Sequence, residues 1–117
     1  MKRNAAISFL PEGESIDFAD DKGGYYAAED GDRSVYFRPD LPEGAAEWGY
    51  TADGVLAGLS FICPCGCKAV VGLLIDHGGW TFQGARDLAR PTLASSILRV
   101  SGCRWHGHLR AGVFEEC

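Results

Sequence analysis

Three cysteines alternate with a proline and a glycine in the run Cys63-Pro64-Cys65-Gly66-Cys67, which constrains the fold more than any other stretch of the chain. Thiols at alternate positions have the wrong local geometry to form disulfides among themselves. The chain has five cysteines, an odd number for a disulfide framework. Clustered thiolates are instead typical metal ligands. The run therefore predicts a metal site on a tight turn.

A second ligand box, Cys103-x-x-His106, follows later in the chain. Structural zinc sites usually take four ligands from two tight turns, and a gap of two residues lets both side chains of this box converge on one ion. Zn²⁺ is the expected ion, because Cys₃His ligation in a cytosolic protein favours zinc over iron. We expect the ligands to come from five residues, with one of the three clustered thiols left over: Cys63, Cys65, Cys67, Cys103 and His106.

The segments around the cysteine run have the composition of strands. Apolar, β-forming residues lead into the run over 59–62 and out of it over 69–75, so we expect a hairpin with the thiols at its tip. Other strands are expected over 5–10 and 34–38, and a last hairpin around Ala111-Gly112. Residues 40–50 are interpreted as a helical turn or a loop. We therefore expect an all-β or β-dominated α+β fold with the metal site between two hairpin tips.

Length and charge bound the domain organisation and the kinds of partner. The 117 residues are expected to form a single domain, with an acidic β and loop portion over 1–57 and a metal-binding hairpin portion over 58–117. Residues 1–54 carry twelve Asp and Glu against five Lys and Arg, whereas residues 55–117 carry four against six. This acidic half argues against a nucleic-acid partner held through phosphates. A protein partner is the expectation.

The apolar runs are short. None approaches the roughly 18–20 residues that span a bilayer, so no membrane association is expected. The basic N-terminal residues are followed too soon by Pro11 for a signal-peptide core. We therefore expect a cytoplasmic protein, in which thiols bind metals more often than they form disulfides.

The second ligand box carries one resemblance. Cys103-x-x-His106-Gly107 is similar to the second ligand box of Rieske iron–sulfur domains, and Cys63-Pro64-Cys65 has the spacing of their Cys-x-His box. Cys65 departs from that pattern, because a Rieske domain has histidine there. The resemblance implies a [2Fe–2S] electron-transfer module as the alternative to a zinc domain.

A longer series of motifs resembles a phage- and prophage-associated family, domain of unknown function 6527. The motifs cover residues 58–114 and run from the cysteine run through Gly79–Phe82, Arg90–Leu93 and Ser96-Ile97 to the Cys-x-x-His box. The resemblance implies a metal-stapled β-domain of phage or mobile-element origin. The expected function is then a small zinc-binding accessory factor that binds a protein partner in the host cytoplasm, with a host protein as the candidate partner.

A catalytic function, as a zinc-dependent hydrolase, is the weaker expectation. Four protein ligands would close the zinc ion to substrate and leave no open coordination position. We expect His77 to be an exposed loop residue, and His108 to point to the opposite face of its strand from His106. Cys117 has no partner in the sequence and is interpreted as a free, exposed thiol. The sequence contains no phosphate-binding loop, nucleophile elbow or dinucleotide fingerprint.

Overall fold

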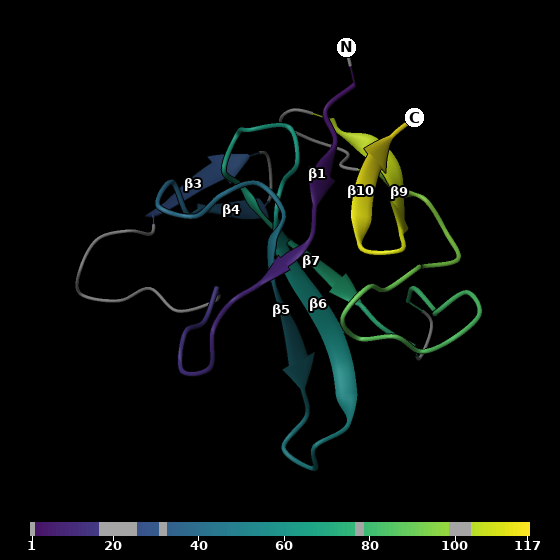
Figure 1. Ribbon diagram of the computed structural model, residues 1–117. Helices are drawn as coiled ribbons and strands as arrows, with labels where there is room; N and C mark the ends of the chain where they lie inside the picture. The colour runs from purple at the N-terminus through teal and green to yellow at the C-terminus, as the bar shows by residue number, and fades with distance from the viewer. Residues whose placement is uncertain (1, 17–25, 31–32, 77–78, 99–103) are drawn as a thin grey trace.

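The regular structure of the chain consists of strands. The computed structural model describes residues 2–16, 26–30, 33–76, 79–98 and 104–117, and within these ranges it contains strands and no helix (Figure 1). The all-β prediction is thus confirmed. The ten strands of the described residues are β1 (Ala5–Ala6), β2 (Ser8–Phe9), β3 (Tyr26–Asp30), β4 (Arg33–Phe37), β5 (Ala45–Tyr50), β6 (Leu56–Ile62), β7 (Val70–Leu74), β8 (Ile97–Leu98), β9 (His106–Arg110) and β10 (Val113–Glu116).

These strands form two four-stranded sheets and one separate hairpin. The strand order is β1-β10-β9-β8 in the first sheet and β2-β5-β6-β7 in the second, while β3 and β4 pair with each other. The N-terminal segment connects the two sheets: β1 pairs antiparallel with β10, and β2 pairs parallel with β5. Figure 1 shows this segment running from the β9–β10 hairpin down to β5. The strand expected over 5–10 is therefore two short strands in different sheets.

The core lies where the two sheets pack against each other. Phe61 of β6 stacks on Phe114 of β10 with ring centroids 4.4 Å apart, and Trp105 meets Phe114 edge-on at 6.3 Å. All three side chains are buried. Aromatic pairs in these geometries contribute about 0.5–1.5 kcal/mol beyond the burial of their area. Cys63 is 0% exposed and belongs to the same cluster, so the first cysteine of the run is anchored directly in the core.

Contacts between the two ends of the described chain hold β1 beside β10. The Trp105 indole N–H donates to the Arg3 carbonyl at 2.8 Å, and Arg3 Nε donates to Glu116 Oε2 at 2.9 Å. Hydrogen bonds from the Arg3 side chain and backbone lower the pKa of Glu116 from 4.5 to about 2. Because the folded-state pKa is depressed, this stabilisation is present above pH 4.5 and is lost as the pH falls towards 2.

Gly107 allows β9 to pass under the Trp105 ring. A Cβ atom at this position would overlap the carbonyl oxygen of Glu115 and lie 2.6 Å from Trp105 Cη2. Since overpacking a core typically costs about 1–3 kcal/mol, we expect Gly107→Ala to lower the free energy of unfolding by at least that amount. Urea denaturation measures the change. Gly72→Ala is the matched control, because a Cβ there meets nothing within 4 Å; equal losses in both variants would contradict this account.

The segment 40–50 differs from its prediction as a helical turn or loop. Ala45–Tyr50 forms β5, which lies between β2 and β6 in its sheet. The β-propensity of its Ala and Gly residues is low, but pairing on both sides and burial of Ala45 and Ala46 override it.

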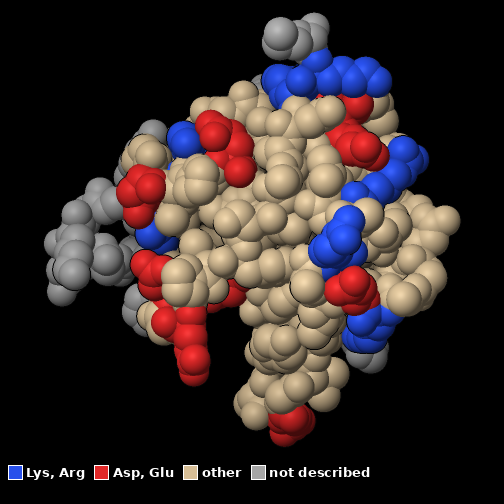
Figure 2. Space-filling model, in the orientation of Figure 1, with Lys and Arg blue, Asp and Glu red and all other residues tan. Residues whose placement is uncertain are grey.

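The acidic half of the sequence includes the β3–β4 hairpin, and Figure 2 shows Asp and Glu concentrated on that side of the molecule.

Candidate functional site

The cysteine run forms the turn between β6 and β7, as the sequence predicts. The Cys63 backbone N–H donates to the Ala69 carbonyl at 2.9 Å and closes the turn onto the end of the hairpin. Gly66 and Lys68 take positive φ values of 98° and 68°. Gly66 adopts this left-handed conformation without steric penalty, whereas Lys68 does so at a cost of about 1–3 kcal/mol that the surrounding hairpin must offset.

All three cysteine side chains of the turn point to one place. Their Sγ atoms lie within 4.8 Å of one another, and those of Cys63 and Cys65 are 3.4 Å apart. In a tetrahedral zinc site with Zn–S bonds of about 2.3 Å, neighbouring sulfurs are about 3.8 Å apart. The backbone N–H of Cys67 donates to Cys65 Sγ at 3.3 Å, which stabilises negative charge on sulfur. This donor set fits a thiolate-bound metal ion, with none of the three clustered thiols held apart.

The Lys68 ammonium group lies next to the cysteine turn but is directed to the loop before β5. Lys68 Nζ donates to the Leu41 carbonyl at 2.9 Å and lies 3.2 Å from Glu43 Oε1. Hydrogen bonds from its own backbone N–H and from Lys68 lower the pKa of Glu43. The ammonium group therefore fastens the cysteine turn to the loop before β5.

The second ligand box is described only in part. Cys103 lies outside the described residues, so its predicted role as a ligand stays a prediction. His106 begins β9 with an exposed side chain, and it is not part of the metal-ligating group found among the described residues. The structure thus brings together the three clustered cysteines and leaves His106 at the surface of the first sheet.

Two histidines share the outer face of β9. Gly107 and Leu109 are buried towards the core, whereas His106, His108 and Arg110 alternate with them on the other side. The expectation that His108 points away from His106 is wrong, because side chains two residues apart lie on the same face of a strand. The adjacent strand β10 contributes Glu115, which is directly opposite His108 in the register.

Cys117 is in contact with His108. The Cys117 backbone N–H donates to the His106 carbonyl at 2.9 Å, which continues the β9–β10 ladder by one residue pair. Its Sγ atom lies 3.7 Å from His108 Nδ1. The prediction of an exposed thiol is confirmed, but the sequence missed its partner. The only sequence signal was the predicted hairpin around Ala111-Gly112, whose register determines this pairing.

A serine precedes the strand that pairs with the start of β9. Ser96 comes immediately before Ile97 of β8, and Ile97 pairs with Gly107, the residue before His108. The Trp80 indole N–H donates to the Ser96 carbonyl at 3.1 Å and fixes the backbone there. The described hydrogen bonds include none from the Ser96 hydroxyl to His108, and such bonds are often long in unliganded enzymes.

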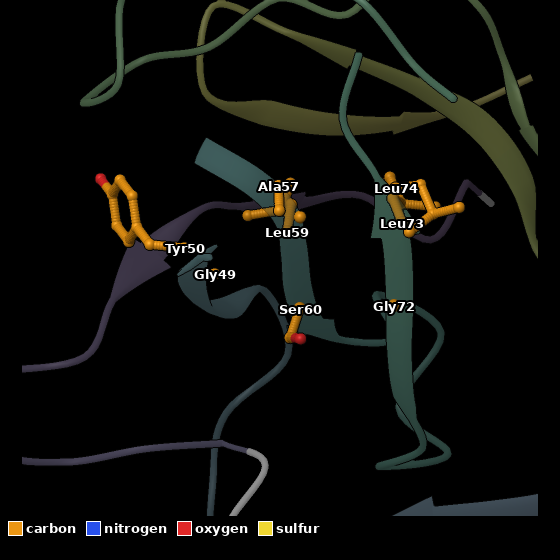
Figure 3. Close-up of a pocket in the computed structure, with 9 residues that line it drawn as sticks. Gly49, Tyr50, Ala57, Leu59, Ser60, Gly72, Leu73 and Leu74 are labelled. Atoms are coloured by element: carbon orange, nitrogen blue, oxygen red, sulfur yellow. The ribbon is translucent and has the colours of Figure 1, made fainter. Parts of the chain in front are cut away.

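Three other described serines are placed differently from Ser96. The Ser15 hydroxyl donates to Glu47 at 2.9 Å, while Ser95 is exposed and alternates with Ser96 along the chain. Ser60 lies in a shallow depression over β5, β6 and β7 (Figure 3). The residues that line this depression include no histidine or cysteine.

Fold and site together define a small all-β domain with a cluster of three thiols at one hairpin tip and a histidine in contact with a cysteine on a sheet face. The family described as "Bacterial ubiquitination-like system serine protease (BubE)" matches residues 36–117, and the chain belongs to this family. No curated protein and no solved structure matches the chain significantly. No helix in the described part of the chain has the length and apolarity to cross a membrane.

The family match corrects one expectation from the sequence. The motifs over residues 58–114 suggested a phage-associated family, domain of unknown function 6527, whereas the family that matches is BubE. The match begins at Tyr36 and therefore includes the last two residues of β4 and all of β5, which lie ahead of the cysteine run. Membership places the chain in a family of bacterial ubiquitination-like systems, which consist of several proteins.

Proposed function

We propose that this protein is a serine hydrolase that cleaves peptide or related acyl bonds in proteins of a bacterial ubiquitination-like system. The observation that carries the proposal is that Ser96 and His108 are each next to a member of the Ile97–Gly107 pair, in a chain whose family is described as a serine protease. Ser96 is assigned as the nucleophile and His108 as the general base. Both side chains are half-buried on the outer face of the first sheet, within reach of a protein substrate.

The assigned roles follow the general chemistry of serine acyl transfer. Ser96 Oγ attacks the substrate carbonyl carbon while His108 Nε2 accepts the hydroxyl proton, and the carbonyl electrons move onto oxygen. Collapse of the tetrahedral intermediate breaks the scissile bond, and His108 gives the proton to the leaving group. Water then attacks the acyl-enzyme with His108 again as the base, which releases the acid and regenerates Ser96.

The cysteine cluster has a structural role in this proposal. Cys63, Cys65 and Cys67 bind one Zn²⁺ ion, and Cys103 supplies the fourth thiolate from the segment before β9. A closed set of four ligands leaves the ion no open position for catalysis. Such an ion would join the β6–β7 turn to the chain that leads into β9, and so keep His108 in register. The exposed position of His106, outside the thiol group, supports a cysteine as the fourth ligand.

Covalent labelling tests the proposed nucleophile without a known substrate. A fluorophosphonate probe phosphonylates activated serines, so we expect the purified protein to be labelled on Ser96, as located by peptide mass spectrometry. Ser96→Ala should abolish labelling. Ser95→Ala should leave it intact, because Ser95 is the adjacent residue but is not opposite a histidine. Labelling at another serine, or none with correctly folded protein, would refute the assignment.

Metal analysis tests the structural part of the proposal separately. We expect one zinc ion per chain and no visible absorbance. A [2Fe–2S] cluster, the electron-transfer alternative, would instead give a coloured protein with two irons per chain. Thiolate ligands also suit iron–sulfur clusters, so elemental analysis of anaerobically purified protein makes the distinction.

A further inference from the structure

Cys117 occupies the position at which an orienting group acts on a catalytic histidine. A neutral imidazole can accept a proton at one ring nitrogen only if the other nitrogen carries hydrogen. In serine hydrolases a third group accepts that hydrogen bond and fixes both the tautomer and the ring orientation. Cys117 Sγ lies 3.7 Å from His108 Nδ1, and the proposed function assigns the other ring nitrogen, Nε2, to the hydroxyl proton of Ser96.

The carboxylate that the register places nearest His108 is directed elsewhere. Glu115 is directly opposite His108 on β10. Its Oε1 atom, however, lies 3.6 Å from Nη1 of Arg110, which is two residues after His108 on the outer face of β9. Cys117 reaches His108 diagonally across the same pair of strands. The sulfur, rather than the carboxylate, is thus the group described in contact with Nδ1.

We infer that Cys117 is a positioning residue of the proposed hydrolase and accepts the His108 Nδ1–H hydrogen bond in place of the usual carboxylate. The inference rests on the proposed function, because it concerns the same Ser96–His108 pair. Cys117 does not touch the substrate and forms no covalent bond. Its sulfur holds the imidazole in the tautomer whose Nε2 lone pair is directed at Ser96, as outer groups around functional histidines commonly do.

The positioning role of Cys117 makes the proposed hydrolase sensitive to thiol reagents, although its nucleophile is a serine. Cys117 is exposed and reacts without unfolding of the chain, whereas Cys63 is buried and the cluster thiols are protected when they bind metal. Methyl methanethiosulfonate transfers its methylthio group to the Cys117 sulfur and releases methanesulfinate, and this transfer forms a mixed disulfide whose sulfur is a poorer acceptor. We therefore expect reagent-treated protein to lose fluorophosphonate reactivity, and a thiol reductant to restore it.

Substitutions of Cys117 test the inference with fluorophosphonate labelling of Ser96 as the readout. We expect Cys117→Ala to lower the labelling rate about tenfold to a hundredfold without a change in melting temperature. Cys117→Asp should recover most of the rate, because a carboxylate accepts the same hydrogen bond and does not react with methyl methanethiosulfonate. A purely structural role would not produce this rescue.

Nitrogen-15 spectra of His108 give a second readout that does not depend on catalysis. We expect the Nδ1–H tautomer in the native protein and a mixture of both tautomers in Cys117→Ala. A native Nε2–H tautomer would show that the thiol donates to Nδ1 and would overturn the inference. Wild-type labelling of Cys117→Ala would also overturn it but leave the proposed function standing, whereas unlabelled native protein would count against the proposed function itself.

Discussion

Replacing Cys65 with serine is expected to release the metal ion and to lower the melting temperature by about 10 °C or more. Cys65 Sγ lies between the other two thiols in sequence and accepts the Cys67 N–H hydrogen bond, so it is central to the ligand group. Metal binding to a structural thiolate site contributes directly to folding. A loss of roughly 3 kcal/mol would give a shift of this size in a domain of about 100 residues.

Differential scanning calorimetry and elemental analysis measure the two effects together. Cys117→Ser is the matched control, because Cys117 is a free thiol on another face of the molecule and should leave metal content and melting temperature unchanged. His106→Gln should also retain the metal if Cys103 is the fourth ligand. Loss of metal in His106→Gln would assign the fourth position to histidine, and full metal content in Cys65→Ser would exclude the cluster as the site.

The fold could be predicted where residues carry their own strand and turn signals. The hairpin around the cysteine run and the one around Ala111-Gly112 are both present, and Ala111 and Gly112 take positive φ values of 47° and 78°. β5 could not be predicted, because its Ala and Gly residues form a strand only through pairing with β2 and β6. These contacts with distant segments are absent from any local pattern.

The candidate site was predictable to the same local extent. Alternation over five residues was sufficient to place three thiols on one turn. The proposed approach of Ser96 to His108 instead depends on the pairing of β8 with β9. A difference of one residue in that register would turn the serine away from the histidine. The sequence therefore placed the three clustered thiols together but gave no reason to select this serine.

The same register distinguishes between the two histidines of β9. His106 is opposite Leu98, a residue that has no proton to give, whereas His108 follows Gly107, the partner of Ile97. We expect His108→Gln to lower the fluorophosphonate labelling rate of Ser96 by about 10²–10⁴-fold, the usual contribution of a positioned general base. Glutamine keeps a similar volume and polarity, so the half-buried position should still fold.

His106→Gln is the control on the same strand and face. Its labelling rate should stay within about threefold of the native value, because removing an exposed side chain two positions away leaves the base intact. Time courses with the probe in excess give the two rates. A large loss in His106→Gln with a normal rate in His108→Gln would transfer the base to His106, diagonal to Ser96 in the register. Equal rates in all three proteins would mean that neither histidine activates the serine, and would remove the observation on which the proposed hydrolase depends.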